Sequence, residues 1–438
     1  MSINSMETEI DIEASAPKAV VVEEKEAEIE AQPVPLTFPE GGLHAWLTLL
    51  GTVLIQYSTF GYTIAYGAFQ DFYVREYLTK YSPSAIGWIG GTQIFLVFSS
   101  GIVVGRLFDR GYFHHLMIGG CLIHAFSFFM LSLTKENQFY QVFLSHGVGI
   151  GLASGLTYVP SLGIVSHYFQ KKRALAMGVV AAGTALGATL HPIMVNQLVY
   201  SSIGFHGAIR IISGMNCVLF VIANLIMRPR LPPRKNAPRI AVSSYFKEPT
   251  YTFMVVGGMF VLAGLFFPSF YIQLAAIRKG VDENTAFYLL SALNAASIFG
   301  RTIPPLYAPK LGVTNLNIAS TFIMGIVGIC MLFVSNTAGF IVFAIAYGFV
   351  SGSTISLTAT MIASVANSVD EVGSRMGISF AFAGLLALFS QPISGALLTT
   401  NFIWLNGILF SGITILCSGA SLLVARHYLV RHRGTQFV

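Results

Sequence analysis

Long apolar stretches separated by short polar breaks run through the chain after residue 40. A helix that crosses roughly 30 Å of hydrocarbon needs about 20 residues, and each of these stretches reaches that length. We count twelve, over approximately 45–69, 85–107, 113–133, 140–164, 174–198, 207–227, 251–275, 285–308, 313–334, 338–363, 375–399 and 403–425. Because lipid admits only helices or closed barrels, and these runs are too long for barrel strands, the pattern predicts an all-helical membrane protein.

Composition supports this reading and removes several soluble classes. Hydrophobic residues make up 54% of the 438 residues and charged residues only 10%, whereas a soluble domain carries about 25% charge. The four cysteines lie inside apolar runs without metal-ligand spacing, so neither a metal nor a disulfide is predicted. The sequence also contains no ATP-binding loop of the type Gly-x4-Gly-Lys-Ser/Thr. We expect no cofactor and no nucleic-acid partner.

The distribution of charge predicts the orientation in the membrane. Residues 1–40 hold ten acids, two bases and four prolines, which predicts a disordered acidic tail and excludes a secretory signal. Alternate connections between the apolar stretches hold sixteen Lys and Arg residues on one side and five on the other. Because cytoplasmic loops carry the excess of positive charge, both termini and the long basic connection are expected in the cytoplasm.

An internal repeat predicts the domain organisation. Met177-Gly178 and His191-Pro192 in the fifth stretch match Met376-Gly377 and Gln391-Pro392 in the eleventh. Gly-rich membrane helices also resemble one another by composition alone, which is the alternative explanation. We expect a tail (1–40), a six-helix bundle (41–228), a basic cytoplasmic linker (229–250), a second six-helix bundle (251–426) and a cytoplasmic tail (427–438).

Three motifs resemble those of a known family. GRLFDRG at 105–111 resembles the loop signature of the major facilitator superfamily. PEGGLHAW at 39–46 and YFQKKRALAMG at 168–178 are similar to signatures of its monocarboxylate porter family in the fungal form. The resemblance covers nearly all of 39–430 and implies twelve helices in two pseudosymmetric six-helix bundles, which alternate access to a central site.

The charged parts of these motifs are candidates for conformational gating. They are Arg106, Asp109 and Arg110 after the second helix and Lys171, Lys172 and Arg173 before the fifth. An acid at such a turn can pair with a base or cap a helix, and so stabilise one arrangement of the bundles. The alternative is a loop whose basic side chains only extend to the membrane surface.

Arg301 is the main candidate for binding substrate. It lies roughly 10 Å from the cytoplasmic end of the eighth helix at 1.5 Å per residue, where an unpaired guanidinium indicates a water-filled cavity that holds an anion. Asn294 and Ser297 share its helix face. The alternative is that Arg301 reaches the inner interface, helped by a break at Pro304-Pro305.

Proton coupling is left open by the sequence. In animal members of the resembled family an Asp four residues before the helix-eight Arg handles protons, but this position is Ser297 here, and Ala68 lies at the place of their helix-one Lys. The nine acids after residue 40 all lie in predicted connections or at helix ends. Coupling would therefore fall to the substrate itself or to His124, His146 and His191, each of which has a hydrogen bond to a neighbouring helix as its alternative role.

Further substrate contacts are expected from His191 beside Pro192 and from tyrosines on the first, seventh and tenth helices. The resemblance implies that these three helices line the cavity, which makes Tyr66, Tyr271 and Tyr347 candidates. Most membrane aromatics only pack or anchor, which is the alternative for each of them.

The sequence therefore predicts a secondary transporter of a small organic anion or weakly acidic metabolite, with export of a fungal secondary metabolite favoured. Uptake of monocarboxylates or of a vitamin-like acid is the alternative, and a membrane sensor without transport is the alternative from another class. An enzyme is not expected, because no set of histidines and acids gathers at one membrane depth. The expected location is the plasma membrane, with the vacuolar membrane as alternative; substrate identity and oligomeric state are not predicted.

Overall fold

The computed structural model describes residues 38–170, 172–231, 242–366, 369–398 and 402–438. These residues form helices joined by short connections, and no strand occurs among them. Ten helices in this part are long and apolar enough to cross a membrane. The prediction of an all-helical membrane protein is confirmed.

The ten candidate spans and two further long helical segments reproduce the twelve predicted stretches. In the first half they comprise α4 and α5 (Pro83–Ser99, Gly101–Asp109), α6 (Phe113–Leu131), α7, η3 and α8 (Phe139–Val142, Phe143–Ile150, Gly151–Val165), α9 (Arg173–Val199) and α10 (Gly204–Ile226). In the second half they are α12 (Pro249–Arg278), α14 with η4 (Val313–Cys330, Met331–Phe333), α15 (Thr337–Ser364), α16 (Val369–Leu398) and α17 (Trp404–Arg433). The other two are the interrupted first segment, over 43–77, and α13 (Glu283–Leu311).

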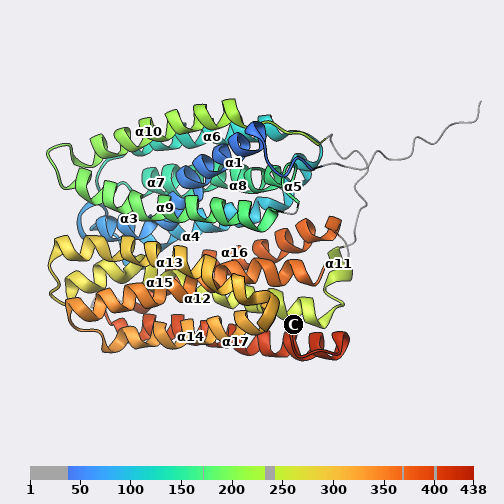
Figure 1. Ribbon diagram of the computed structural model, residues 1–438. Coiled ribbons are helices and arrows are strands. Elements are labelled where there is room, and N and C mark those ends of the chain that lie inside the picture. Colours follow the sequence, from blue (N-terminus) through green and yellow to red (C-terminus); the bar gives the residue numbers. More distant parts are fainter. Residues whose placement is uncertain (1–37, 171, 232–241, 367–368, 399–401) are drawn as a thin grey trace, which may run out of the picture. The chain divides into compact units, whose positions relative to one another are not determined.

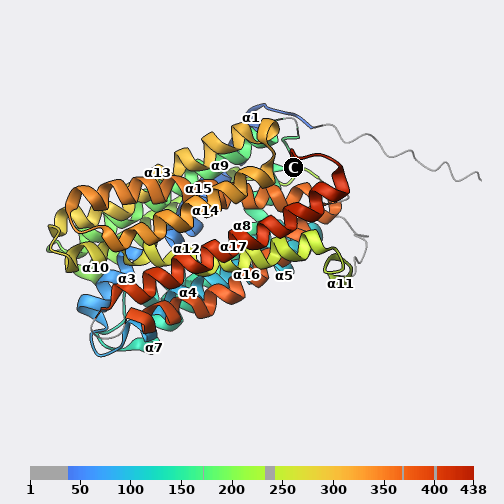
Figure 2. The ribbon, with the colours of Figure 1, turned by 90° about the horizontal axis from the view of Figure 1, so that it is seen from below.

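The helices form two bundles, joined by a linker that contains the short helix α11 (Val242–Tyr245). In Figure 1 the blue to green helices of the first bundle lie above the yellow to red helices of the second, and Figure 2 shows the same helices from below. We call the end that carries α11 and the C-terminus the linker end, and the opposite end, which carries residues 73–82 and 279–282, the Arg75 end.

The bundles meet through α4 against α16 and α9 against α13. At the Arg75 end the first of these contacts is very close: a Cβ atom on Gly91 would lie 2.6 Å from the carbonyl oxygen of Leu388, and one on Gly395 would lie 2.5 Å from that of Pro83. Small residues let the helix backbones approach to this distance. The Arg75 end is therefore closed by backbone packing between the bundles.

The first helical segment is irregular. It consists of α1 (Leu43–Gln56), the π-helical turn η1 (Tyr57–Gly61), the single turn α2 (Tyr62–Ile64), α3 (Tyr66–Phe72) and the π-helical turn η2 (Tyr73–Tyr77). π-helical turns are rare and occur frequently at functional sites. The segment continues eight residues past the predicted end at 69, because its last turns are buried by protein: Tyr73 and Tyr77 bond to His146 and Thr134 of the first bundle.

An acid fixes the linker end of the first bundle. The backbone amide of Glu40 donates to the carbonyl of Tyr168 at 3.1 Å, and its carboxylate accepts from the amides of Gln170 and Lys172 at 2.8 and 2.9 Å. The ring of Trp46 packs edge-on against Phe169, with 5.5 Å between centroids. Two motifs that are more than a hundred residues apart in the sequence are therefore in contact.

An acid just before the first helix of the second bundle has a similar role. The Glu248 carboxylate accepts two hydrogen bonds from the Arg375 guanidinium, each 2.7 Å long. This guanidinium also lies over the rings of Tyr245 and Tyr251, at 4.6 and 5.2 Å from their centroids. In both bundles an acid before the first helix thus binds at the start of the fifth, as the predicted repeat would lead one to expect.

Candidate substrate cavity

A cavity lies between the bundles and contains about 960 Å³ of empty space, including space open to solvent. The first bundle contributes Phe60, Ile64, Phe98 and Tyr158, and the second contributes residues of α12, α13, α15 and α16. Phe98 and Phe380 belong to the halves of α4 and α16 nearest the linker end. Since the Arg75 end is closed by packing, we infer that the cavity opens toward the linker end.

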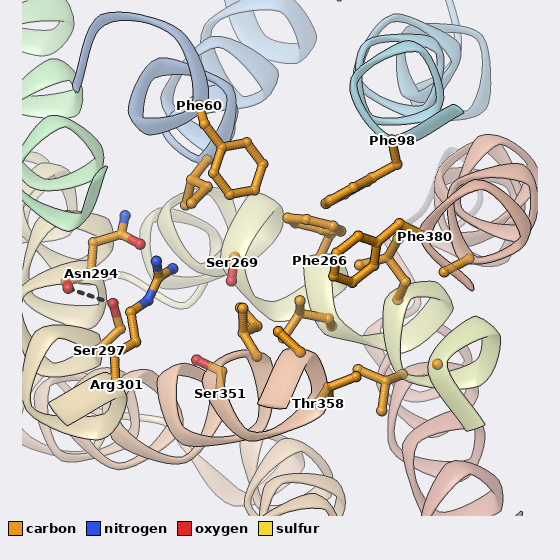
Figure 3. A pocket seen from close by; sticks show the side chains of 18 of the residues that line it. Phe60, Phe98, Phe266, Ser269, Asn294, Ser297, Arg301, Ser351, Thr358 and Phe380 are labelled. Atoms are coloured by element: carbon orange, nitrogen blue, oxygen red, sulfur yellow. Dashed lines mark hydrogen bonds between the residues drawn. The ribbon is translucent and has the colours of Figure 1, made fainter. Parts of the chain in front are cut away.

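Arg301 on α13 is the cation of this cavity. Figure 3 shows its guanidinium directed into the space between the bundles, on the opposite side from Phe98 and Phe380. Its Nε atom is buried and has no hydrogen-bond partner, and within the described part of the chain no acid forms an ion pair with it. A half-buried cation without a counter-charge is costly inside a membrane protein, so this site favours an anion.

Asn294 and Ser297 lie beside Arg301 on the same wall, as their helical spacing predicts. The Asn294 Nδ2 atom donates to the carbonyl of Ala188 on α9 at 3.0 Å, and the Ser297 hydroxyl donates to the carbonyl of Asn294 at 2.7 Å. Asn294 therefore also joins the two bundles. No hydrogen bond to its side-chain Oδ1 atom is described within the residues that the structure covers, and this oxygen can accept one from a ligand.

The other predicted substrate contacts lie away from the cavity wall in this conformation. The Tyr66 and Tyr347 hydroxyls donate to the carbonyls of Ile86 and Leu265 at 3.3 and 2.9 Å, and the Tyr271 hydroxyl accepts from Gln70 at 3.1 Å. His191 is fully buried, with Nδ1 2.8 Å from the carbonyl of Gly187. Here these side chains connect helices, and their contact with substrate stays a prediction.

Phenylalanines supply much of the cavity surface, and the sequence did not predict Phe60, Phe98 or Phe380 for it. Phe60, Phe98, Phe266 and Phe380 come from four different helices and face the same space. In an apolar helix a cavity phenylalanine has the same sequence context as one that faces lipid. No signal in a single sequence distinguishes the two.

A polar network joins the bundles at the Arg75 end. The Arg75 guanidinium binds the Asp71 carboxylate, with a shortest distance of 2.7 Å, and the Glu283 carboxylate of the second bundle at 3.1 Å. Gln273 of the second bundle also donates to Asp71, at 2.9 Å. Arg75 donates to the Tyr200 hydroxyl at 2.9 Å, and burial raises the pKa of that hydroxyl, which keeps it neutral.

Asp71 corrects one sequence-based expectation. The expected place was a connection or the end of a helix, but Asp71 lies in α3, six residues before the helical segment ends at Tyr77, and has an exposed fraction of 0%. The expectation failed because the first segment stays helical after its apolar run ends. A buried carboxylate therefore sits at the interface of the bundles, paired with Arg75 and bonded to the opposite bundle.

The predicted gating residues gather on the surface of the linker end. Arg106, Asp109 and Arg110 are exposed at the end of α5, and Lys172 and Arg173 are exposed at the start of α9, while Lys171 lies outside the described residues. Among the described residues, no group of three or more His, Cys, Asp or Glu side chains is placed to hold a metal ion. The gating role stays a prediction.

Known proteins resemble this chain in sequence or in fold. It is 38% identical to the aspyridones efflux protein of Emericella nidulans over 87% of this chain and 77% of that protein. It is 34% identical to the agnestins efflux protein of Paecilomyces divaricatus, over 87% of both chains. A solved bacterial homologue of the human lysosomal transporter Spinster matches with a TM-score of 0.66 at 14% identity, over 89% of this chain and 98% of that one.

The family model described as Major Facilitator Superfamily matches residues 48–338, which is more than half of the chain. Its match spans the first bundle, the linker and the start of the second bundle, including the helix that carries Arg301. The all-helical fold with two bundles and the similarity to efflux proteins agree with this match. The chain belongs to the major facilitator superfamily of membrane transporters.

Proposed function

We propose that this protein exports a weakly acidic secondary metabolite by alternating access, without direct use of ATP. The observation that carries the proposal is the Arg301 guanidinium, which faces a largely apolar cavity between the bundles and has no acid partner among the described residues. The names of the similar efflux proteins support the direction of transport.

The cavity indicates the chemistry of the cargo. Arg301, Asn294 and Ser297 line one wall, while the rings of Phe60, Phe98 and Phe380 line the other side. A guanidinium binds a carboxylate or enolate through two parallel hydrogen bonds, and aromatic rings bind a flat apolar body. The best-fitting substrate is an amphipathic organic anion with its charge at one end and a ring system at the other.

The conformation fits the loading step of an exporter. The linker end, where the cavity is accessible, carries most of the Lys and Arg residues, so the positive-inside rule assigns it to the cytoplasm. Substrate would enter from the cytoplasm and leave once the Arg75 end opens and the linker end closes. We assign the protein to the plasma membrane, with both termini in the cytoplasm.

Within the superfamily we assign the chain to the fungal monocarboxylate porters. The two motifs that carry this assignment meet in the structure, where Glu40 binds the backbone of Gln170 and Lys172. This chain differs from the family's animal members in one respect: Ser297 stands where they carry the helix-eight Asp. Substrate binding and proton handling would thus be separate in this protein, with Arg301 left to bind the anion.

Transport into membrane vesicles tests the proposal. A panel of radiolabelled organic acids is offered to vesicles that contain the wild-type chain or the Arg301→Ala variant. We expect transport of at least one aromatic acid by the wild type and its loss in the variant. The matched control is Arg210→Ala, because Arg210 is a membrane arginine outside the cavity whose Nε donates to the Ser132 hydroxyl. Equal transport by Arg301→Ala and wild type would overturn the anion site.

A further inference from the structure

A cluster of buried polar side chains occupies the interior of the first bundle. Tyr62 lies at its centre, with its ring centroid 6.3, 5.5 and 5.5 Å from the rings of His124, His146 and His191. The three histidines come from α6, η3 and α9, and each has an exposed fraction of 1% or less. Asn216 on α10 is equally buried. We call these five residues the histidine cluster.

Most hydrogen-bonding atoms of the histidine cluster lack a partner in the described structure. These are both ring nitrogens of His124, the Nε2 atom of His191 and both amide atoms of Asn216. The side chains of His191 and Asn216 are neighbours, but the two do not form a hydrogen bond of good geometry. Each unsatisfied buried group costs about 1–3 kcal/mol, so such a group in a native interior needs an explanation. Close-packed apolar helices would be more stable here, which indicates that the cluster has a function.

His146 is the member best placed to hold a proton. Its Nδ1 atom lies 2.8 Å from the Tyr73 hydroxyl and its Nε2 atom lies 3.3 Å from the Tyr62 hydroxyl. A neutral imidazole donates through one nitrogen and accepts through the other, whereas an imidazolium donates through both. Because a hydroxyl both donates and accepts, the two tyrosines satisfy His146 in either form.

The first helical segment connects the histidine cluster to the substrate cavity. Phe60 and Ile64 line the cavity, whereas Tyr62 between them faces the histidines. This stretch contains the π-helical turn η1 and the single turn α2, so its backbone departs from a regular α-helix. The cavity wall and the cluster are therefore two faces of the same irregular segment.

The same cluster is also joined to the opposite bundle. His191 lies on α9 three residues after Ala188, whose carbonyl accepts the hydrogen bond from Asn294 of the cavity wall. The turn η1 packs tightly on α9, since a Cβ atom on Gly187 would lie 2.3 Å from the carbonyl oxygen of Tyr57. A movement around the histidines is thus transmitted to helices that face the substrate.

We propose that the histidine cluster is a proton-binding site that couples proton movement to the exchange between the two conformations. One proton from solvent binds an imidazole nitrogen, gives an imidazolium and returns to solvent on the other side in the opposite conformation. This inference rests on the proposed export function and adds the site that would drive it. It also places the driving proton away from Arg301.

The charged and titratable surroundings fit a single transferable proton. Around the cluster the first segment presents four tyrosines, and α6, η3 and α9 present one histidine each. The tyrosines are Tyr57, whose ring centroid lies 4.9 Å from that of His191, and Tyr62, Tyr66 and Tyr73. On α10 the neighbouring polar groups are Asn216 and Ser213, and α4 brings Gln93, which donates to Thr63. The hydrogen bonds and ion pairs described for these side chains involve no Asp, Glu, Lys or Arg.

The sign of the coupling follows from burial. In the present conformation, open at the linker end, the histidines are enclosed and none of the ion pairs described supplies the cluster with a counter-charge, so a positive charge there is costly. The protonated form therefore favours the other conformation, in which the Arg75 end is open. Acid should therefore shift the population toward that conformation. A cycle in which the proton binds from outside and is released inside requires a shift in this direction.

Two measurements that need no substrate test the proposal. Magnetic-resonance spectra of the full chain with isotope-labelled histidine, in lipid nanodiscs, report the protonation of each imidazole between pH 5 and 8.5. Spin labels at Leu133→Cys and Phe333→Cys, two exposed positions at the Arg75 end, report opening of that end, in a background where the four native cysteines are replaced. Variants His146→Gln and His191→Gln remove parts of the cluster.

We expect a cluster histidine to change its protonation in this pH range. We also expect acid to raise the population with the longer spin–spin distance by about 5–150-fold, the usual range for coupling between two sites. The His146→Gln and His191→Gln variants should lose this response, and the control His114→Gln should keep it, because His114 is exposed on the same helix as His124.

Two results would overturn the proposal. The first is that all three histidines of the unmutated chain stay neutral from pH 5 to 8.5, a result that does not depend on any variant folding. The second is a pH response that persists without the cluster histidines. Absence of organic-acid transport together with an intact, cluster-dependent pH response would instead reject the proposed cargo and support the proton site.

Discussion

Replacing Gly91 by alanine should open the Arg75 end. The added Cβ atom would lie 2.6 Å from the backbone carbonyl oxygen of Leu388, whereas ordinary contact begins at 3.4 Å. A backbone atom cannot rotate away, so α4 and α16 must separate locally by several tenths of an ångström. Overpacking of this kind costs about 1–3 kcal/mol.

This cost falls on one conformation only, because the close contact between α4 and α16 exists while the Arg75 end is closed. A bias of 1–3 kcal/mol changes a two-state ratio by about 5–150-fold. Spin labels at Leu133→Cys and Phe333→Cys, measured in nanodiscs at constant pH, should therefore show more of the longer distance in Gly91→Ala than in the wild type.

The matched control for this substitution is Gly119→Ala. Gly119 lies in α6, and a Cβ atom there would have no heavy atom within 4 Å, so the distance distribution should stay as in the wild type. If Gly91→Ala folds and yet gives the wild-type distribution, the closed Arg75 end does not depend on this contact, and the reasoning is refuted.

Three further substitutions probe the ion pairs and the linker end. Glu283→Gln should raise the population with the longer spin–spin distance less than fivefold, because Glu283 is 57% exposed and such pairs contribute only about 0–1 kcal/mol. A larger effect would show that the ion pair itself closes the Arg75 end. Arg375→Ala should lower the free energy of unfolding by on the order of 2 kcal/mol and with it the melting temperature. The loss is smaller than for a fully buried ion pair because Glu248 is 42% exposed, and an unchanged melting temperature would contradict this prediction. Glu40→Gln weakens two backbone bonds and should increase amide hydrogen exchange at Gln170 and Lys172, whereas unchanged exchange would remove Glu40 from this role.

The helices could be predicted from the sequence because lipid imposes a length and a composition on each span. The predicted stretch 207–227 corresponds to Gly204–Ile226, and 338–363 corresponds to Thr337–Ser364. Prediction was poorer where the polypeptide is buried by protein rather than by lipid. The first segment passes its predicted end by eight residues in this way. α17 also continues beyond its predicted end at 425, to Arg433, because its last two turns are largely exposed and carry polar residues outside the apolar run.

The candidate site was predictable in part. Arg301 is conspicuous as a charge inside an apolar run, and helical spacing places Asn294 and Ser297 beside it, as the cavity shows. The predicted tyrosines Tyr66, Tyr271 and Tyr347 carry no signal for the direction of their side chains, and in this conformation they bond to helices. Such contacts depend on how the two bundles meet, which no local pattern in the sequence specifies.

The central claim is that Arg301 binds the negative charge of the transported molecule. The most direct measurement compares binding of an aromatic carboxylic acid and its methyl ester to the purified chain in nanodiscs, for the wild type and for Arg301→Ala. A hydrogen bond to a charged group contributes about 1.5–3 kcal/mol, so the wild type should prefer the acid by about 10–150-fold and the variant should bind both compounds equally. A variant that keeps the preference, or a wild type that shows none, would contradict the account.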